Sequence, residues 1–338
     1  MERYHKALVT EIEQFARERT HNTPLKTIHM GGGTPSTYPP TLLLDMYGIL
    51  KKNFIIDPQA ELALEVNPGT VSDATIAAWR AVGINRLSIG VQAVNDRVLQ
   101  SLNRHQTAAQ VFGLLDKVAP FFDNISIDLI LGLPGISATE WRALLETVVQ
   151  WSIKHISIYF LTIHEDTPLY VKVQANQITL PPDEEMVTLY EYTCDLLAQH
   201  GFEQYELSNF AKPGYASRHN SAYWDRVPYK GFGIGACSFD GAARFQNDKN
   251  IVRYMELCER QEPVVKFCEQ LTEKQIWLEQ LMLSLRRPQG ISVEMINNLA
   301  TVERLIDNGY LEYHGTHVRL TRRGLAVENE ILAQLAHI

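Results

Sequence analysis

Residues 27–36 read TIHMGGGTPS, a short β-branched run followed directly by three glycines. This stretch predicts a strand that ends at Met30. It also predicts a turn at Gly31, Gly32 and Gly33 in which backbone without Cβ atoms can approach a ligand closely. A tight turn without a ligand would use the same glycines, so the stretch alone leaves both interpretations open. It is not a P-loop, because no Gly-Lys-Ser/Thr follows, and it does not match GxGxxG.

Five further apolar runs follow, and stretches of helical periodicity separate them. The predicted strands are Thr27–Met30, Leu62–Val66, Arg86–Val91, Ile125–Leu131, Ile156–Leu161 and Gln204–Leu207. Strands that alternate with helices predict βαβ units and a parallel sheet, so the expected fold class is α/β. We interpret these strands as apolar on both faces, as a sheet covered by helices requires.

Polar side chains recur at or near the carboxyl ends of these strands. Glu65 and Asn67 end the second strand, Ser88 and Gln92 lie on and just past the third, and Asp128 lies inside the fourth. The carboxyl ends of parallel strands form the ligand face of such folds. A carboxylate inside an apolar strand is costly without a partner. For each residue alone, an ion pair or a turn cap is as good an explanation, but the repetition over several strands favours a ligand site.

The motifs GGGTPS, EVNPG, RLSIGVQ, the Arg104-His105 pair and DLILGLPG follow one another along the chain. In this order they resemble radical S-adenosylmethionine (SAM) enzymes of the oxygen-independent coproporphyrinogen III oxidase type, over nearly the whole chain. The resemblance implies an incomplete (β/α)6 half-barrel that lacks its first strand, with a small C-terminal helical or winged-helix-like domain. It also implies that SAM is bound by Gly32, Gly33, Thr34, Glu65, Gln92, Arg104 and Asp128.

Residues 218–224 read RHNSAYW and contain the pattern HNxxYW. This pattern is similar to that of the HemW branch, which comprises haem chaperones. The resemblance implies that His219 offers its imidazole to haem iron, and that Tyr223 and Trp224 offer their faces to the macrocycle. From the residues alone, a histidine that caps a loop beside aromatics in an interdomain seam is the more ordinary interpretation. His105 and His164 are the next candidates for iron ligation.

The function that this resemblance implies is a haem chaperone that binds haem and delivers it to acceptor haemoproteins, respiratory ones among them. The alternative is an enzyme, an oxygen-independent coproporphyrinogen III oxidase that acts through a 5′-deoxyadenosyl radical. Enzymatic activity and a homodimer are both left open.

The family holds a 4Fe–4S cluster on a CxxxCxxC loop, and the cysteines of this chain do not match that pattern. They are Cys194, Cys237, Cys258 and Cys268, without CxxC or CxxxC spacing, so no metal site is predicted. The chain begins in the helix that follows the cluster loop in the family. A truncated or mis-started chain and a clusterless descendant both account for this, and both put cluster-dependent SAM chemistry in question.

Charge and composition limit the classes of partner that we expect this chain to bind. The 338 residues include 31 Lys and Arg against 39 Asp and Glu, a net charge of −8, which argues against a general nucleic-acid binder. The last domain carries seven basic and eight acidic residues, so a groove-reading module is not expected there either. No membrane-spanning run or signal peptide is predicted, and the cytoplasm is the expected location. The expected domains are residues 1–210, an aromatic and Gly-rich connecting region at 211–270, and 271–338.

Overall fold

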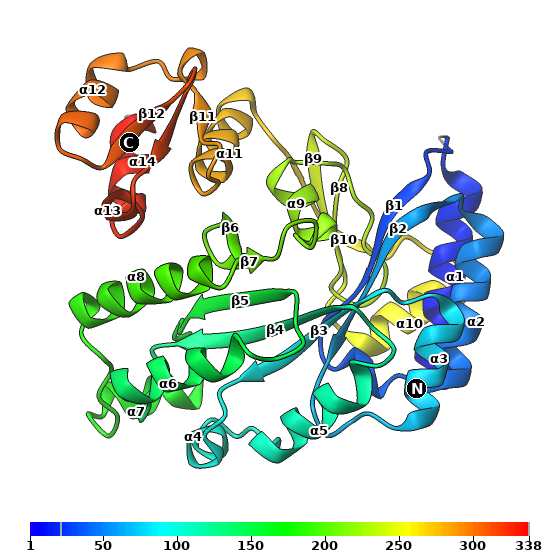
Figure 1. Ribbon diagram of the computed structural model, residues 1–338. Coiled ribbons are helices and arrows are strands. Elements are labelled where there is room, and N and C mark those ends of the chain that lie inside the picture. The colour runs from blue at the N-terminus through cyan, green and yellow to red at the C-terminus, as the bar shows by residue number, and fades with distance from the viewer. Residues whose placement is uncertain (21, 337–338) are drawn as a thin grey trace.

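The computed structural model describes residues 1–20 and 22–336. Its main element is a seven-stranded sheet that curls into a half-barrel, in the order β1-β2-β3-β4-β5-β7-β6 (Figure 1). The first five strands pair in parallel. The strands are β1 (Leu25–Met30), β2 (Ile56–Val66), β3 (Arg86–Gln92), β4 (Asn124–Leu131), β5 (His155–Phe160), β6 (Glu203–Glu206) and β7 (Asn209–Ala211). The expected α/β half-barrel is confirmed.

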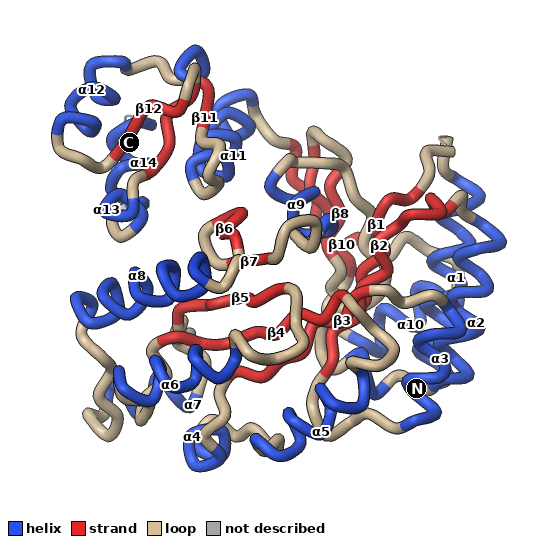
Figure 2. The backbone as a smooth tube through the Cα atoms, in the orientation of Figure 1, coloured by secondary structure: helices blue, strands red, loops and turns tan. Residues whose placement is uncertain are grey.

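Helices connect the strands and cover the convex side of the sheet (Figure 2). Two of them begin at capping boxes, in which Thr107 pairs with Gln110 and Ser137 with Glu140, so that side chains satisfy the free N–H groups of the first turn. The helices are α1 (Glu2–Glu18), α2 (Pro40–Asn53), α3 (Asp73–Val82), α4 (Asp96–Ser101), α5 (Ala108–Val118), α6 (Ala138–Val148), α7 (Pro168–Gln174) and α8 (Asp183–Gln199).

The two faces of the sheet differ in chemistry, so the expectation of two apolar faces is wrong. On the convex side Leu87, Ile127 and Ile156 are fully buried under the helices. The alternate residues face inward and are mostly polar: Arg86, Ser88, Asn124, Ser126, Asp128, His155 and Ser157. Successive side chains of a strand point to opposite faces, so each apolar run carried a polar residue at every second position.

The end of the sheet also differs from the expectation of a sixth strand that continues the parallel order. The predicted strand Gln204–Leu207 is β6, and it pairs antiparallel with β7 rather than with β5. The short strand β7 lies between them, antiparallel to both. The turn at Leu207-Ser208 folds the chain back on itself, so the inner of the two hairpin strands, β7, takes the place beside β5.

The connecting region is more ordered than the sequence indicates. It contains α9 (Arg218–Trp224), α10 (Ile251–Glu259) and a three-stranded antiparallel sheet of β8 (Cys237–Phe239), β9 (Ala243–Asn247) and β10 (Val265–Gln270). The region adjoins the start of the half-barrel, where α10 packs against α1 and α9 against β1 (Figure 1).

The C-terminal region has its own hydrophobic core, which includes Leu281, Val302 and Val318. Three short strands pair in the order β11-β13-β12, and the β12–β13 hairpin forms the expected wing. A short 3-10 turn (η2) forms at Val293–Met295. The other elements are α11 (Glu273–Leu285), β11 (Ile291–Ser292), α12 (Leu299–Asp307), β12 (Leu311–His314), β13 (His317–Leu320), α13 (Arg322–Leu325) and α14 (Glu328–Ala336). Among the described residues, no helix combines the length and apolar character needed to cross a bilayer.

Candidate functional site

The short helix α9 is anchored to the polar, concave face of the half-barrel. Glu61 of β2 is 5% exposed, and its carboxylate accepts hydrogen bonds from the Ser217 hydroxyl (3.2 Å) and from the backbone N–H groups of Arg218 (3.0 Å) and His219 (2.9 Å). These N–H groups belong to the first turn of α9, where no partner within the helix is available. Glu61 therefore fixes the start of the helix on the sheet.

His155 of β5 and Tyr205 of β6 hold the same turn of α9 from another side. His155 lies 2.7 Å from the Ser126 hydroxyl through Nδ1 and 2.8 Å from the Tyr205 hydroxyl through Nε2. The Tyr205 oxygen accepts from the backbone N–H of Ser217 and the side-chain amide of Asn220, both at 3.4 Å. Burial lowers the pKa of His155 well below its usual range, so this imidazole is neutral.

His219 is held on both ring nitrogens. Its Nδ1 lies 3.0 Å from the Thr27 hydroxyl of β1, and its Nε2 lies 3.0 Å from the Tyr223 hydroxyl one helical turn further on. The ring stacks on His29 of β1, with centroids 4.7 Å apart and planes 12° from parallel. Burial and the neighbouring His29 lower the pKa of His219 to about 4. The imidazole is therefore neutral at physiological pH, which is the form that binds metals.

Aromatic side chains continue outward from His219. The Tyr223 ring meets the edge of Tyr229 at a centroid distance of 4.7 Å, and Tyr229 lies 6.4 Å from Phe239 of β8. Tyr223 is 41% exposed. Trp224 is half-buried, and its buried Nε1 has no hydrogen-bond partner among the described residues. The structure thus brings His219 and Tyr223 into contact, with Trp224 adjacent in the helix.

The glycine loop after β1 lies next to this histidine pair. The Gly32 N–H donates to Glu65 Oε2 at 3.0 Å, and Glu65 Oε1 lies 3.2 Å from Nε2 of His29. The His29 hydrogen bond holds the pKa of Glu65 below its usual range, so its carboxylate is ionised. Gly32 and Gly33 have positive φ values (82° and 59°), and a Cβ on either would meet only open space. These two glycines therefore form an open backbone turn beside an anionic side chain.

Asp128 lies deeper on the concave face. The Ser88 hydroxyl is 3.3 Å from both of its carboxylate oxygens, and Ser157 also donates to it. Burial is the main cause that raises the pKa of Asp128 to about 6, although both serines oppose the shift. A partly buried carboxyl with such a pKa is typical of functional sites.

The remaining predicted residues lie apart from these contacts. Gln92 has a φ of 66° at the end of β3. Thr34 precedes a 3-10 turn (η1, Pro35–Thr37) and accepts from Thr37 through its backbone oxygen. Arg104, His105 and His164 are exposed on loops. The residues that sequence reasoning missed are Thr27, His29, Glu61, His155 and Tyr205, all on strands, where polar positions alternate with apolar ones.

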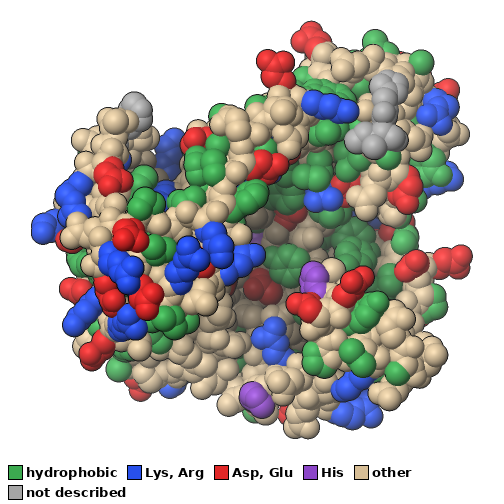
Figure 3. Space-filling model, turned by 180° about the vertical axis from the view of Figure 1, so that it is seen from behind, with side chains coloured by type: hydrophobic (Ala, Val, Ile, Leu, Met, Phe, Trp, Pro, Cys, Tyr) green, Lys and Arg blue, Asp and Glu red, His purple; other side chains and the backbone are tan. Residues whose placement is uncertain are grey.

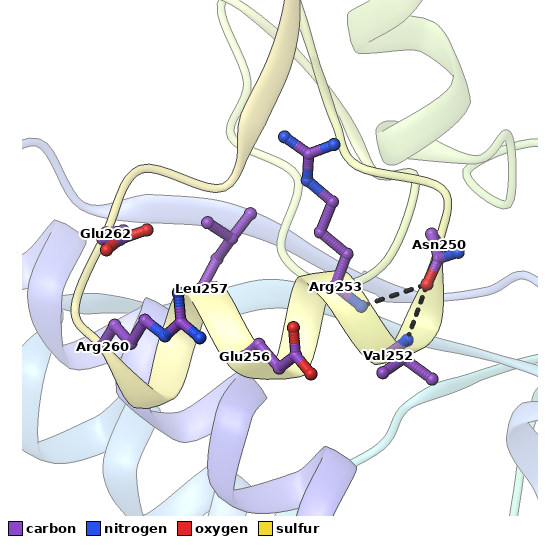
Figure 4. A pocket seen from close by; sticks show the side chains of 7 residues that line it. All are labelled: Asn250, Val252, Arg253, Glu256, Leu257, Arg260 and Glu262. Atoms are coloured by element: carbon purple, nitrogen blue, oxygen red, sulfur yellow. Dashed lines mark hydrogen bonds between the residues drawn. The ribbon is translucent and has the colours of Figure 1, made fainter.

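Space-filling shows a hollow near the centre of the molecule beside the C-terminal domain, with hydrophobic, acidic and histidine side chains around it (Figure 3). A separate groove lies along α10 (Figure 4). Its lining side chains all come from residues 250–262, and Asn250 caps the helix through the N–H groups of Val252 and Arg253. None of the residues predicted for ligand binding lines that groove.

Comparison with known proteins places this chain in a family. A model of the radical SAM superfamily matches residues 2–148, and one of the HemN C-terminal domain matches residues 271–327. Heme chaperone HemW of Synechocystis sp. is 33% identical, over 89% of this chain and 76% of the relative. Heme chaperone HemW of Bacillus subtilis is 32% identical, over 93% of this chain and 86% of the relative. The chain belongs to the HemW family.

A solved structure supports the same fold. Coproporphyrinogen III oxidase (HemN) from Escherichia coli, a radical SAM enzyme, superposes with a TM-score of 0.81 over 99% of this chain and 83% of its own, at 22% identity. At this identity the similarity concerns the fold alone. The sequences therefore favour HemW over the oxidase.

The described residues do not fit the 4Fe–4S cluster that the radical SAM superfamily carries. Cys194 and Cys258 are buried, Cys237 and Cys268 are exposed. In residues 1–20 and 22–336 no three His, Cys, Asp or Glu side chains converge as a metal site. The open glycine turn and the Glu65 carboxylate, by contrast, fit a small ligand that carries an ammonium group.

Proposed function

We propose that this HemW-family chain binds haem at α9 and delivers it to acceptor haemoproteins, respiratory ones among them. The observation that carries the proposal is His219, a neutral imidazole held between Thr27 and Tyr223 on a helix that two buried groups fix to the sheet. Imidazole is a common axial ligand of haem iron. The curated relatives named heme chaperones support this function.

The aromatic side chains suit the macrocycle. Tyr223 is partly exposed and meets Tyr229 edge to face, which leaves ring surface next to His219 for a flat apolar ligand. Trp224 extends the same helix toward the C-terminal domain, where Asp225 and Arg226 form ion pairs with Arg287 and Glu279. These ion pairs hold the far end of α9.

The glycine loop and the concave face are the second proposed site, for SAM. Gly32, Gly33 and Thr34 would line its methionine part, and the Glu65 carboxylate would accept from its ammonium group. Asp128, Gln92 and Arg104 complete the set that the resemblance implies. SAM yields a 5′-deoxyadenosyl radical only when a cluster donates an electron, so we assign these residues a binding role.

Titration with ferric haem, followed by absorbance, tests the haem proposal. His219→Ala is expected to weaken binding by tenfold or more, which corresponds to about 1.4 kcal/mol. His105→Ala and His164→Ala are matched controls, because both histidines are exposed on loops away from α9, and both variants are expected to bind as the parent chain does. If either control loses binding while His219→Ala retains it, the iron ligand lies elsewhere and the proposal fails.

A further inference from the structure

The two ring nitrogens of His219 have different surroundings. Nδ1 lies on the partly buried side, against the Thr27 hydroxyl of β1. Nε2 lies on the exposed side, where Tyr223 is its partner. A metal-bound imidazole uses one nitrogen as ligand and donates the other N–H to a second group that fixes the ring. Thr27 is placed to accept from Nδ1–H, which leaves Nε2 as the nitrogen that iron can reach.

That nitrogen already has a partner. With the proton on Nδ1, the lone pair of Nε2 accepts from the Tyr223 hydroxyl at 3.0 Å. The same lone pair would bind the iron, so the two interactions exclude each other. We propose that the Tyr223 hydroxyl competes with haem iron for Nε2 of His219, and that haem binds only when this hydroxyl has moved away. The inference rests on the proposed haem function and adds a gate to the same site.

Tyr223 has the properties that such a gate requires. It is 41% exposed, and it lies one turn from His219 on the same face of α9, so side-chain rotation alone can separate the two groups.

The exchange is balanced. The O–H···Nε2 hydrogen bond breaks, a coordinate bond forms between Nε2 and iron, and the Tyr223 hydroxyl keeps its proton and bonds to water. No electron moves, and the iron keeps its oxidation state. On release the hydroxyl returns to Nε2 and satisfies the nitrogen that the iron leaves. This suits a carrier, which must give up its cargo.

Tyr223→Phe tests the gate, because it keeps the ring and removes the competing hydroxyl. We expect ferric haem to bind about fivefold more tightly, mainly through faster association, with the same absorption spectrum as the parent complex. Fivefold corresponds to about 1 kcal/mol, the net contribution of an ordinary hydrogen bond. Tyr229→Phe is the matched control, since it removes a hydroxyl from the adjoining ring and leaves the His219–Tyr223 contact intact. It is expected to bind as the parent does.

A readout without haem tests the hydrogen bond itself. In haem-free protein labelled with ¹⁵N-histidine, the Nε2 signal of His219 is expected to shift in Tyr223→Phe and to stay in Tyr229→Phe. Unchanged or weaker haem binding in Tyr223→Phe overturns the gate, as does an unchanged Nε2 signal. If His219→Ala binds haem as the parent does, the proposed haem site itself fails, whatever Tyr223→Phe does.

Discussion

The two faces of the half-barrel sheet carry different side chains: the convex face is apolar and the concave face is mostly polar. Along β4, Ile125, Ile127 and Leu129 point to the convex side and are fully buried under helices, whereas Ser126 and Asp128 point to the concave side. The convex residues contribute to stability through apolar burial, which is non-directional. The concave residues satisfy one another by hydrogen bonds and hold α9, so each depends on a particular partner.

This difference explains why the polar face can carry the site. A buried polar group that loses its partner keeps the full cost of desolvation, whereas an apolar residue loses only packing. Buried Glu61 and His155 therefore depend on the groups that they position, and partly buried Asp128 depends on its serine partners. The comparison predicts that substitutions on the two faces change the free energy of unfolding by different amounts, with different signs and with different pH dependence.

The largest effect is expected on the convex face. Ile127→Ala removes a fully buried side chain and leaves a cavity, so the free energy of unfolding should fall by about 2–5 kcal/mol. Ser126→Ala, its neighbour on the other face, leaves Nδ1 of buried His155 without its partner and should cost about 1–3 kcal/mol. Urea unfolding of both variants measures this. Equal losses would mean that the faces do not differ in this way.

The second effect is a gain in the free energy of unfolding, and it is expected for Asp128→Asn on the concave face. The pKa of Asp128 is raised from 3.8 to about 6, so the folded chain binds this proton more tightly than the unfolded chain does. Its contribution to stability is present below about pH 4 and is lost as pH rises through 6. Asp128→Asn should therefore be about 1–3 kcal/mol more stable than the parent at pH 7, and this gain should shrink at pH 4.5.

Urea titrations of Asp128→Asn and the parent at both pH values measure the difference. A variant that is less stable at both would show that Asp128 serves the fold rather than a ligand.

The smallest expected effect is on the slope of the free energy of unfolding against pH. Burial depresses the pKa of His155 in the folded chain, so the unfolded chain binds a proton there first as pH falls below about 6.5. The parent chain should lose stability between pH 6.5 and 5. His155→Gln cannot take up that proton. Its free energy of unfolding should therefore fall less steeply than that of the parent, by up to about 1.4 kcal/mol per pH unit. Parallel curves for the two chains would place a charged His155 in the folded state.

Local sequence was sufficient for the half-barrel strands up to β5 and for the residues with local patterns. The three glycines, the strand of Asp128 and the HNxxYW segment could all be recognised, and β1 to β5 formed where alternation with helices predicted them. The contacts that complete the site join residues far apart in the chain: Glu61 with His219, and His29 with Glu65. No spacing encodes such pairs, because they depend on which strands become neighbours.

The pairing of β6 with β7 was missed for a related reason. Gln204–Leu207 has strand character whichever neighbour it takes, and the hairpin turn decides the order at the end of the sheet. The polar face was also open to recognition, since Arg86, Ser88, Ser126 and His155 stand at alternate positions. The average hydrophobicity of each run does not show that alternation.

Chemical rescue of His219→Gly tests the central claim most directly, because it asks whether an imidazole at this one position binds the iron. The ferric haem complex of the variant should lack the absorption spectrum of the parent, and free imidazole should restore it by filling the space beside Thr27 and His29. His105→Gly, treated identically, should show the parent spectrum throughout. A parent-like spectrum for His219→Gly before imidazole is added would contradict the claim that α9 supplies the iron ligand.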